Sequence, residues 1–127
     1  MRFSILLIVA LSLGGCATKE PIHDVIGAAI EPPPGRILSV RVVATAIQRA
    51  GQSLGWQMTV EGPGLLAGRL ARRSHLAVVV IEYNAGSYSI RYRESVNLDA
   101  RDGQIHRGYN EWVKSLDKAI RNELQTL

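Results

Sequence analysis

Four strand-like runs lying between two helix-like segments constrain the fold of this chain most. The runs alternate apolar with polar side chains or are rich in β-branched residues, as is typical of strands. They occupy Trp56–Glu61, Leu66–Ala71, Leu76–Tyr83 and Ser87–Arg93. Turn residues separate them, most clearly at Gly62-Pro63-Gly64 and Asn84-Ala85-Gly86. Because short turns join antiparallel neighbours, the pattern predicts an antiparallel sheet.

Helical periodicity marks one segment before the strands and one after them. The first covers 39–54, where Ser39 is suited to cap the N-terminus and Gly55 to end the helix in a left-handed conformation. The second covers 108–124, and its apolar stripe consists of Tyr109, Val113, Leu116, Ile120 and Leu124. We therefore expect one helix on each side of the strands.

These elements predict an α+β fold. The 127 residues suffice for one domain with a modest core. The economical packing is a two-layer sandwich, with a helix before and a helix after an antiparallel sheet of three to four strands. Both helices then cover one face. The count is three if the first two runs form one bent strand.

The start of the chain has the features of an export signal. Arg2 precedes an apolar run over Phe3–Leu13, which is about half the ~20 residues that span a bilayer as a helix. Leu13-Gly14-Gly15-Cys16 then resembles the lipobox of bacterial lipoproteins. That resemblance implies cleavage before Cys16, a diacylglycerol thioether on its sulfur and acylation of its new amino group. Since Cys16 is the only cysteine, neither an internal disulfide nor a cysteine zinc site is expected.

The expected organisation is a cleaved lipoprotein signal peptide over 1–15, a lipidated and proline-rich tether over 16–36, and a periplasmic α+β domain over 37–127. Three consecutive prolines in Glu31–Gly35 favour an extended tether. Ala17, where aspartate would retain a lipoprotein at the inner membrane in well-studied Gram-negative bacteria, indicates the outer membrane, facing the periplasm. The inner membrane and the cell surface remain alternatives.

Net charge gives a second hint about partners. Fifteen Lys and Arg against eleven Asp and Glu give +4, which becomes +3 once Arg2 is removed. The alternation places several arginines on the sheet face away from the helices. The candidates for binding an anionic envelope component or an envelope protein are Arg69, Arg73, Arg91 and Arg93. The alternative is a solvated face whose charges discourage edge pairing. Nucleic acid is not expected, because the strand tyrosines alternate to the other face.

The segment Ser95–Trp112 is rich in hydrogen-bonding side chains and allows two interpretations. In the structural one, Ser95, Asn97, His106 and Asn110 satisfy backbone groups and cap the second helix. In the functional one, a ligand or partner cleft is built from Asn97, His106, Tyr109, Asn110 and Trp112.

Catalysis is the alternative from another function class. Ser95, His106 and either Asp99 or Asp102 supply the residue types of a hydrolase triad, but no nucleophile-elbow motif surrounds the serine. His23, His75 and His106 lack the spacing of metal ligands, and no cofactor is expected. We therefore expect a non-catalytic binding or structural module.

The pattern as a whole resembles small uncharacterised lipoproteins of proteobacteria. The segments that carry this resemblance are the lipobox, Gly55-Trp56, Pro63-Gly64, Arg73-Ser74-His75, Ile81-Glu82-Tyr83, residues 92–98, Ile105-His106 and residues 109–113. The resemblance implies a membrane-anchored location and the α+β fold, but no activity.

Overall fold

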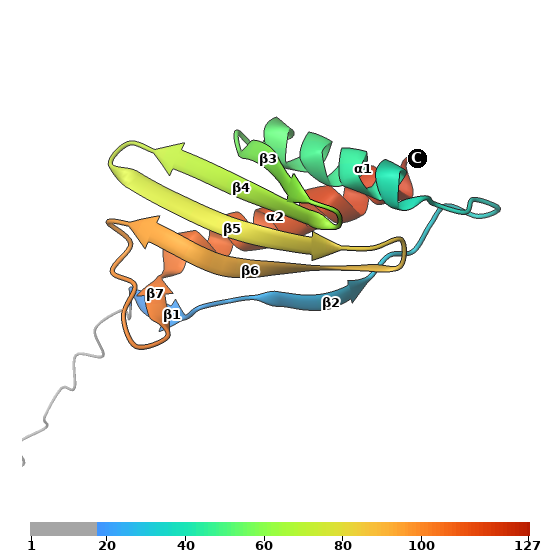
Figure 1. Ribbon diagram of the computed structural model, residues 1–127. Coiled ribbons are helices and arrows are strands. Elements are labelled where there is room, and N and C mark those ends of the chain that lie inside the picture. The colour runs from blue at the N-terminus through green and yellow to red at the C-terminus, as the bar shows by residue number, and fades with distance from the viewer. Residues whose placement is uncertain (1–17) are drawn as a thin grey trace, which may run out of the picture.

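The computed structural model describes residues 18–127, so the signal peptide predicted over 1–15 and the lipidation predicted at Cys16 lie outside the described residues. The elements are β1 (Lys19–Pro21), β2 (Val25–Ala29), α1 (Val40–Ser53), β3 (Gln57–Gly62), β4 (Leu65–Arg72), β5 (His75–Tyr83), β6 (Ser87–Val96), β7 (Gln104–His106) and α2 (Arg107–Gln125). Figure 1 shows a twisted sheet with α2 behind it and α1 along the top.

The main sheet has five antiparallel strands in the order β2-β6-β5-β4-β3. The predicted α+β class and antiparallel pairing are confirmed, and all four predicted runs are separate strands, β3 to β6. The predicted count of three to four strands is wrong, because β2 adds an edge strand beside β6. A bulge between Val25 and Ala28 interrupts that added pairing.

The tether predicted over 16–36 is wrong for residues 19–29, because this stretch belongs to the folded domain. β1 pairs with β7 in a separate two-stranded sheet, with Lys19 opposite His106. Val25 and Ile30 are buried in the core. The proline-rich stretch after Ile30 is a loop that leads to α1, and residues 22–24 connect β1 to β2. The domain therefore begins at Lys19 and not at residue 37.

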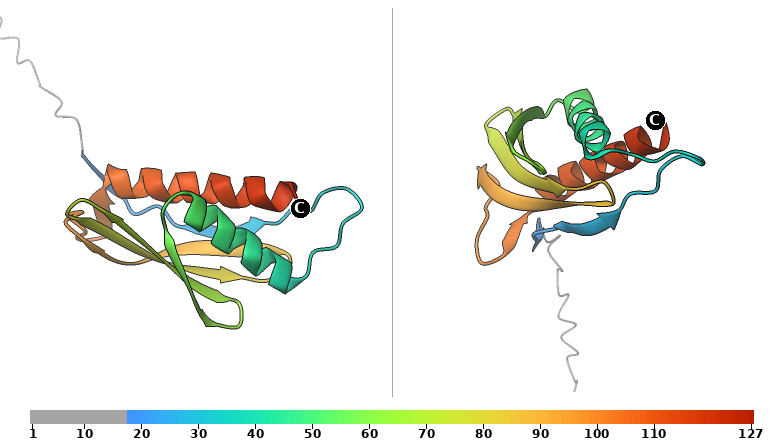
Figure 2. Two further views of the ribbon diagram at one scale, coloured as in Figure 1. Left: turned by 90° about the horizontal axis from the view of Figure 1, so that it is seen from above. Right: turned by 45° about the vertical axis from the view of Figure 1, so that its right-hand side comes forward.

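Both predicted helices are confirmed, with ends close to those expected. Ser39 Oγ accepts a hydrogen bond from Val42 N–H at 3.3 Å, and Gly55 has a φ of +88°. Figure 2 shows α1 and α2 on the same side of the sheet. Their apolar stripes meet the inner sheet face in one core, whose largest fully buried side chains include Tyr88, Tyr109, Ile47, Leu66, Leu70 and Ile81.

Candidate functional site

Three of the four predicted partner-binding arginines lie on the outer sheet face, which points away from the helices. Arg69 is on β4, and Arg91 and Arg93 are on β6. Because Ile90 of β6 is buried in the core, alternation along the strand turns Arg91 outward. Arg73 lies instead in the turn between β4 and β5, at one end of the sheet.

Ion pairs engage two of these arginines. Arg91 Nε lies 3.1 Å from Glu82 Oε1. Arg93 donates two hydrogen bonds to the Glu61 carboxylate, at 2.6 and 2.7 Å, across the two strands that separate β6 from β3. The Arg93 guanidinium holds the pKa of Glu61 below its usual value. An anionic partner would have to displace both carboxylates, so this pairing weakens the case for an anion platform here.

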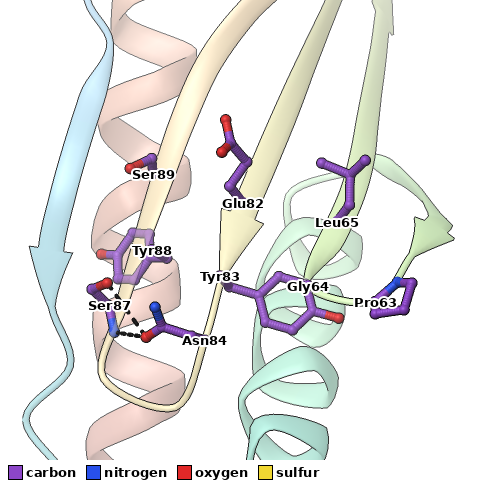
Figure 3. Close-up of a pocket in the computed structure, with 9 residues that line it drawn as sticks. All are labelled: Pro63, Gly64, Leu65, Glu82, Tyr83, Asn84, Ser87, Tyr88 and Ser89. Atoms are coloured by element: carbon purple, nitrogen blue, oxygen red, sulfur yellow. Dashed lines mark hydrogen bonds between the residues drawn. The ribbon is translucent and has the colours of Figure 1, made fainter.

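A polar hollow of about 640 Å³ opens where the β3–β4 and β5–β6 turns meet (Figure 3). Asn84 Oδ1 accepts hydrogen bonds from the N–H groups of Gly86 and Ser87, both at 2.8 Å, which stabilise the second turn. Among the lining residues only Glu82 is charged, and Arg91 already binds it. The hollow therefore offers hydrogen-bonding groups but no cation for an anionic ligand.

An apolar groove with a volume of about 540 Å³ lies beside this polar hollow. Pro63, Gly64 and Tyr83 line both and form the wall between them. The other lining residues of the groove are Val40, Arg41 and Ala44 of α1, with Val60 and Gly62 of β3. Val40 is 48% exposed and Val60 is 59% exposed. Ile37, three residues before α1, is 98% exposed. The groove therefore exposes two large apolar side chains, Val40 and Val60, and Ile37 is exposed on the loop that leads to α1.

Gly64 shapes the wall that the hollow and the apolar groove share. Its φ of +67° is one that residues with a Cβ rarely adopt, and a Cβ there would lie 2.8 Å from the carbonyl oxygen of Tyr83. Tyr83 N–H donates a hydrogen bond of 3.0 Å to Gly64 O. The β3–β4 turn can therefore lie directly against the end of β5.

The sequence patterns did not indicate this groove. Periodicity places Val40 and Val60 on the apolar stripes of their elements, where burial is the expectation. The structure leaves both side chains exposed, because within residues 18–127 no further element covers the start of α1 and the end of β3. Which part of an apolar stripe stays uncovered depends on tertiary packing and not on local sequence.

Three residues of the segment Ser95–Trp112, Asn97, His106 and Asn110, make backbone contacts of the kind that its structural interpretation predicts. Asn97, with φ +58°, donates a hydrogen bond of 2.6 Å from Nδ2 to Ser74 O in the neighbouring turn. His106 Nδ1 accepts a hydrogen bond of 3.0 Å from Gly108 N–H and caps α2. Asn97 therefore stabilises the β4–β5 turn, and His106 stabilises the N-terminus of α2.

Asn110 is 2% exposed, and its side chain binds hydrogen-bonding groups in the N-terminal stretch of the domain. Its Oδ1 accepts a hydrogen bond from His23 N–H at 2.9 Å. Its Nδ2 donates to Pro21 O at 2.9 Å and to Glu20 Oε2 at 3.1 Å. The Asn110 amide thus binds β1 and the residues after it to α2.

The two aromatic candidates of the predicted cleft are placed apart. Tyr109 is fully buried, and its ring meets Tyr92 edge-on with centroids 5.5 Å apart. Burial raises the pKa of Tyr109, and its hydroxyl has no hydrogen-bond partner among the described residues. Trp112 lies elsewhere, beside Trp56 and Leu70. The cleft stays a prediction that these positions do not favour.

The structure does not join the side chains of the hydrolase alternative. Ser95 Oγ lies 2.9 Å from the hydroxyl of Tyr92, and His106 Nδ1 is engaged by the backbone of α2. Within the described chain, no hydrogen bond links Ser95 or either loop aspartate to His106. The alternative stays a prediction that no observed contact supports.

Comparison with models of protein families, with curated proteins and with solved structures finds no match for this chain. In residues 18–127, no group of three or more His, Cys, Asp or Glu side chains is placed to hold a metal ion. No helix in that same range is long and apolar enough to cross a membrane.

Proposed function

We propose that this chain is a lipid-anchored protein of the bacterial cell envelope, held on the outer membrane and facing the periplasm, whose domain binds another envelope component without catalysis. The apolar run that ends in Leu13-Gly14-Gly15-Cys16 supports the anchor. Its likeness to small proteobacterial lipoproteins supports the same location. The contacts of Ser95 and His106 favour structural over catalytic use of that segment.

The apolar groove is the observation that carries the binding role. An exposed group of apolar side chains beside a cavity is typical of an interaction site. The groove is lined by the start of α1 and by the β3–β4 turn. These segments lie at the end of the molecule opposite β1 and β7 (Figures 1 and 2). An anchored domain thus presents the groove away from its own membrane. Since Arg41 is the charged lining residue, the partner is an envelope protein that inserts an apolar side chain next to a carboxylate.

A photo-activated crosslinking residue at Val60 tests this role in cells. We expect it to give one discrete adduct, because its side chain lines the groove. The matched control is Thr59, which is also exposed but turns to the opposite face of β3. The crosslinking residue at position 59 should give at most roughly a tenth of the adduct obtained at position 60. That ratio corresponds to about 1.4 kcal/mol. Immunoblotting and mass spectrometry of the adduct measure both yields.

Adding Val40→Asp to the Val60 crosslinking variant should abolish the adduct, because it places a carboxylate in the apolar wall without touching the buried core. Equal adducts from positions 59 and 60, or an adduct that survives Val40→Asp, would show that the groove is not the binding surface.

A further inference from the structure

We propose that the end of the domain where the chain enters docks on anionic phospholipid headgroups of the membrane that carries the anchor. The surface concerned, called the basic end, consists of Lys19, Arg72, Arg73, Arg101 and Arg107. This inference deepens the proposed function and rests on lipidation of Cys16. The reach of the chain, the charge gathered at this end and the conformation of one arginine support it.

The reach of the chain brings this end of the domain to the lipid surface. Thr18 O accepts a hydrogen bond from Arg107 N–H at 2.8 Å, and Ile22 N–H donates to Gly103 O at 2.9 Å. The fold therefore holds the chain from Thr18 onward. Lys19 lies three positions after Cys16, and three steps of fully extended chain span at most ~10 Å. A lipidated Cys16 therefore keeps β1 and β7 next to the headgroups.

Several chain segments bring basic side chains to this same end. The β4–β5 turn, the loop 97–103, the start of α2 and the entry of β1 all lie there (Figures 1 and 2). All five cations of the basic end are exposed. The carboxylates on these same segments are Asp99 and Asp102 on the loop, Glu20 on β1, which Asn110 binds, and Glu111 near the start of α2, which pairs with Lys114. The five cations therefore exceed the two carboxylates that have no partner among the described residues.

Four of the five basic side chains at this end are also free for an external anion. Among the described residues, Lys19, Arg73, Arg101 and Arg107 make no side-chain hydrogen bond or ion pair, whereas Arg91 and Arg93 on the sheet face are paired with glutamates. Arg72 donates a hydrogen bond of 2.8 Å to Leu54 O, the carbonyl oxygen of the C-cap residue of α1. An anionic leaflet attracts each such cation within a Debye length of about 8 Å at physiological salt.

Arg73 occupies a position where glycine would be less strained. It lies in the two-residue turn between β4 and β5 with a φ of +55°. A side chain with a Cβ pays for this left-handed conformation, and glycine does not. Folding alone therefore gives no reason for arginine here, but its place at the tip of the basic end does. Stability and membrane docking should respond in opposite directions to Arg73→Gly.

The experiment uses the full-length acylated protein, reconstituted into vesicles that contain a lipid with a fluorescence quencher on its headgroup. A fluorophore is attached to Ala100→Cys, on the exposed loop of the basic end, or to Ile37→Cys at the opposite end. Vesicles consist of phosphatidylcholine alone or with about a quarter of phosphatidylglycerol, an anionic lipid. The acylated Cys16 has no free thiol and does not react with the dye.

We expect the label at position 100 to be quenched on the anionic vesicles, less on the neutral ones, and the label at position 37 on neither. Salt at about 1 M, where the Debye length is about 3 Å, should relieve the quenching. Arg73→Gly should lower the ratio of docked to undocked domain about five-fold and leave the thermal midpoint unchanged or higher. Arg49→Ala, which removes an exposed charge from the middle of α1, is the matched control and should change neither quenching nor its salt dependence.

Two results overturn the proposal in distinguishable ways. If the protein stays on the vesicles but label 100 is quenched no more than label 37, or equally on neutral and anionic vesicles, docking is wrong and the anchor stands. If Cys16 reacts with the dye and carries no acyl mass, the anchor is absent and both proposals fall. Retained quenching in Arg73→Gly together with a lower thermal midpoint would assign that arginine to the fold.

Discussion

Replacing Cys16 with serine is expected to move this protein almost completely out of the membrane fraction. The lipobox resemblance implies that three acyl chains are attached at this residue, and each buried methylene contributes about 0.8 kcal/mol to membrane affinity. One chain alone holds a protein only reversibly, whereas several hold it durably. Serine has no sulfur to form the thioether, so the anchor is lost as a whole. Fractionation after a carbonate wash, with the intact mass of the protein, measures the change.

Ala17→Asp is the matched control for this substitution. It leaves Cys16 and its acylation in place and should leave the total membrane fraction unchanged. By the sorting rule of well-studied Gram-negative bacteria it should shift the protein from the outer to the inner membrane, which a density gradient separates. An unchanged membrane fraction for Cys16→Ser would contradict the anchor. An unchanged distribution for Ala17→Asp would contradict only the sorting rule in this bacterium.

The helices and the four central strands were predictable because each has strong local signals. Ser39 and Gly55 bracket α1 with a capping hydroxyl and a residue that adopts positive φ, and both act in the structure as the sequence predicts. β3 to β6 are long, follow one another along the chain and pair through tight turns. Local alternation is then sufficient, because each strand has its partner next to it in sequence.

The three strands missed by sequence analysis lack such signals. β2 contains Gly27, Ala28 and Ala29, which have low strand propensity, and Gly27 has a φ of +59° where the pairing is interrupted. Gly27 N–H bonds Ser89 Oγ at 2.8 Å, a contact across 62 positions of the chain. β1 and β7 have three residues each and exist because they pair with one another. Long-range partners, not local preference, make these segments strands.

Candidate sites were predictable as residue types and not as arrangements. Alternation correctly placed Arg91 and Arg93 outside, but the ion pairs with Glu82 and Glu61 depend on how neighbouring strands align and twist. The basic end depends even more on tertiary structure. Lys19, Arg73 and Arg101 are far apart in sequence and gather only because β1 pairs with β7 at the end where the β4–β5 turn lies.

Asn110→Ala should destabilise the domain by about 3 kcal/mol, from the lost hydrogen bonds and the partners left unsatisfied, and lower its thermal midpoint by roughly 10 °C. The buried amide makes three hydrogen bonds that alanine cannot make, and His23 N–H and Pro21 O lose their partner. Because these bonds attach residues 20–23 to α2, the same variant should speed amide hydrogen exchange at His23 well before it does so in β5. Thermal unfolding and exchange followed by mass spectrometry measure both effects.

Tyr109→Phe is the matched control, one residue away in the same helix and equally buried. Its hydroxyl lacks a partner among the described residues, so its removal should leave the stability unchanged or raise it by about 1 kcal/mol. Equal losses from both variants would mean that Asn110 acts only by filling space.

Release of β1 also links this prediction to docking. The flexible connection would then run from Cys16 to Val25, with a reach of up to ~30 Å, and hold the basic end at the membrane at a lower effective concentration. Asn110→Ala should therefore weaken headgroup quenching without altering any charge of the basic end.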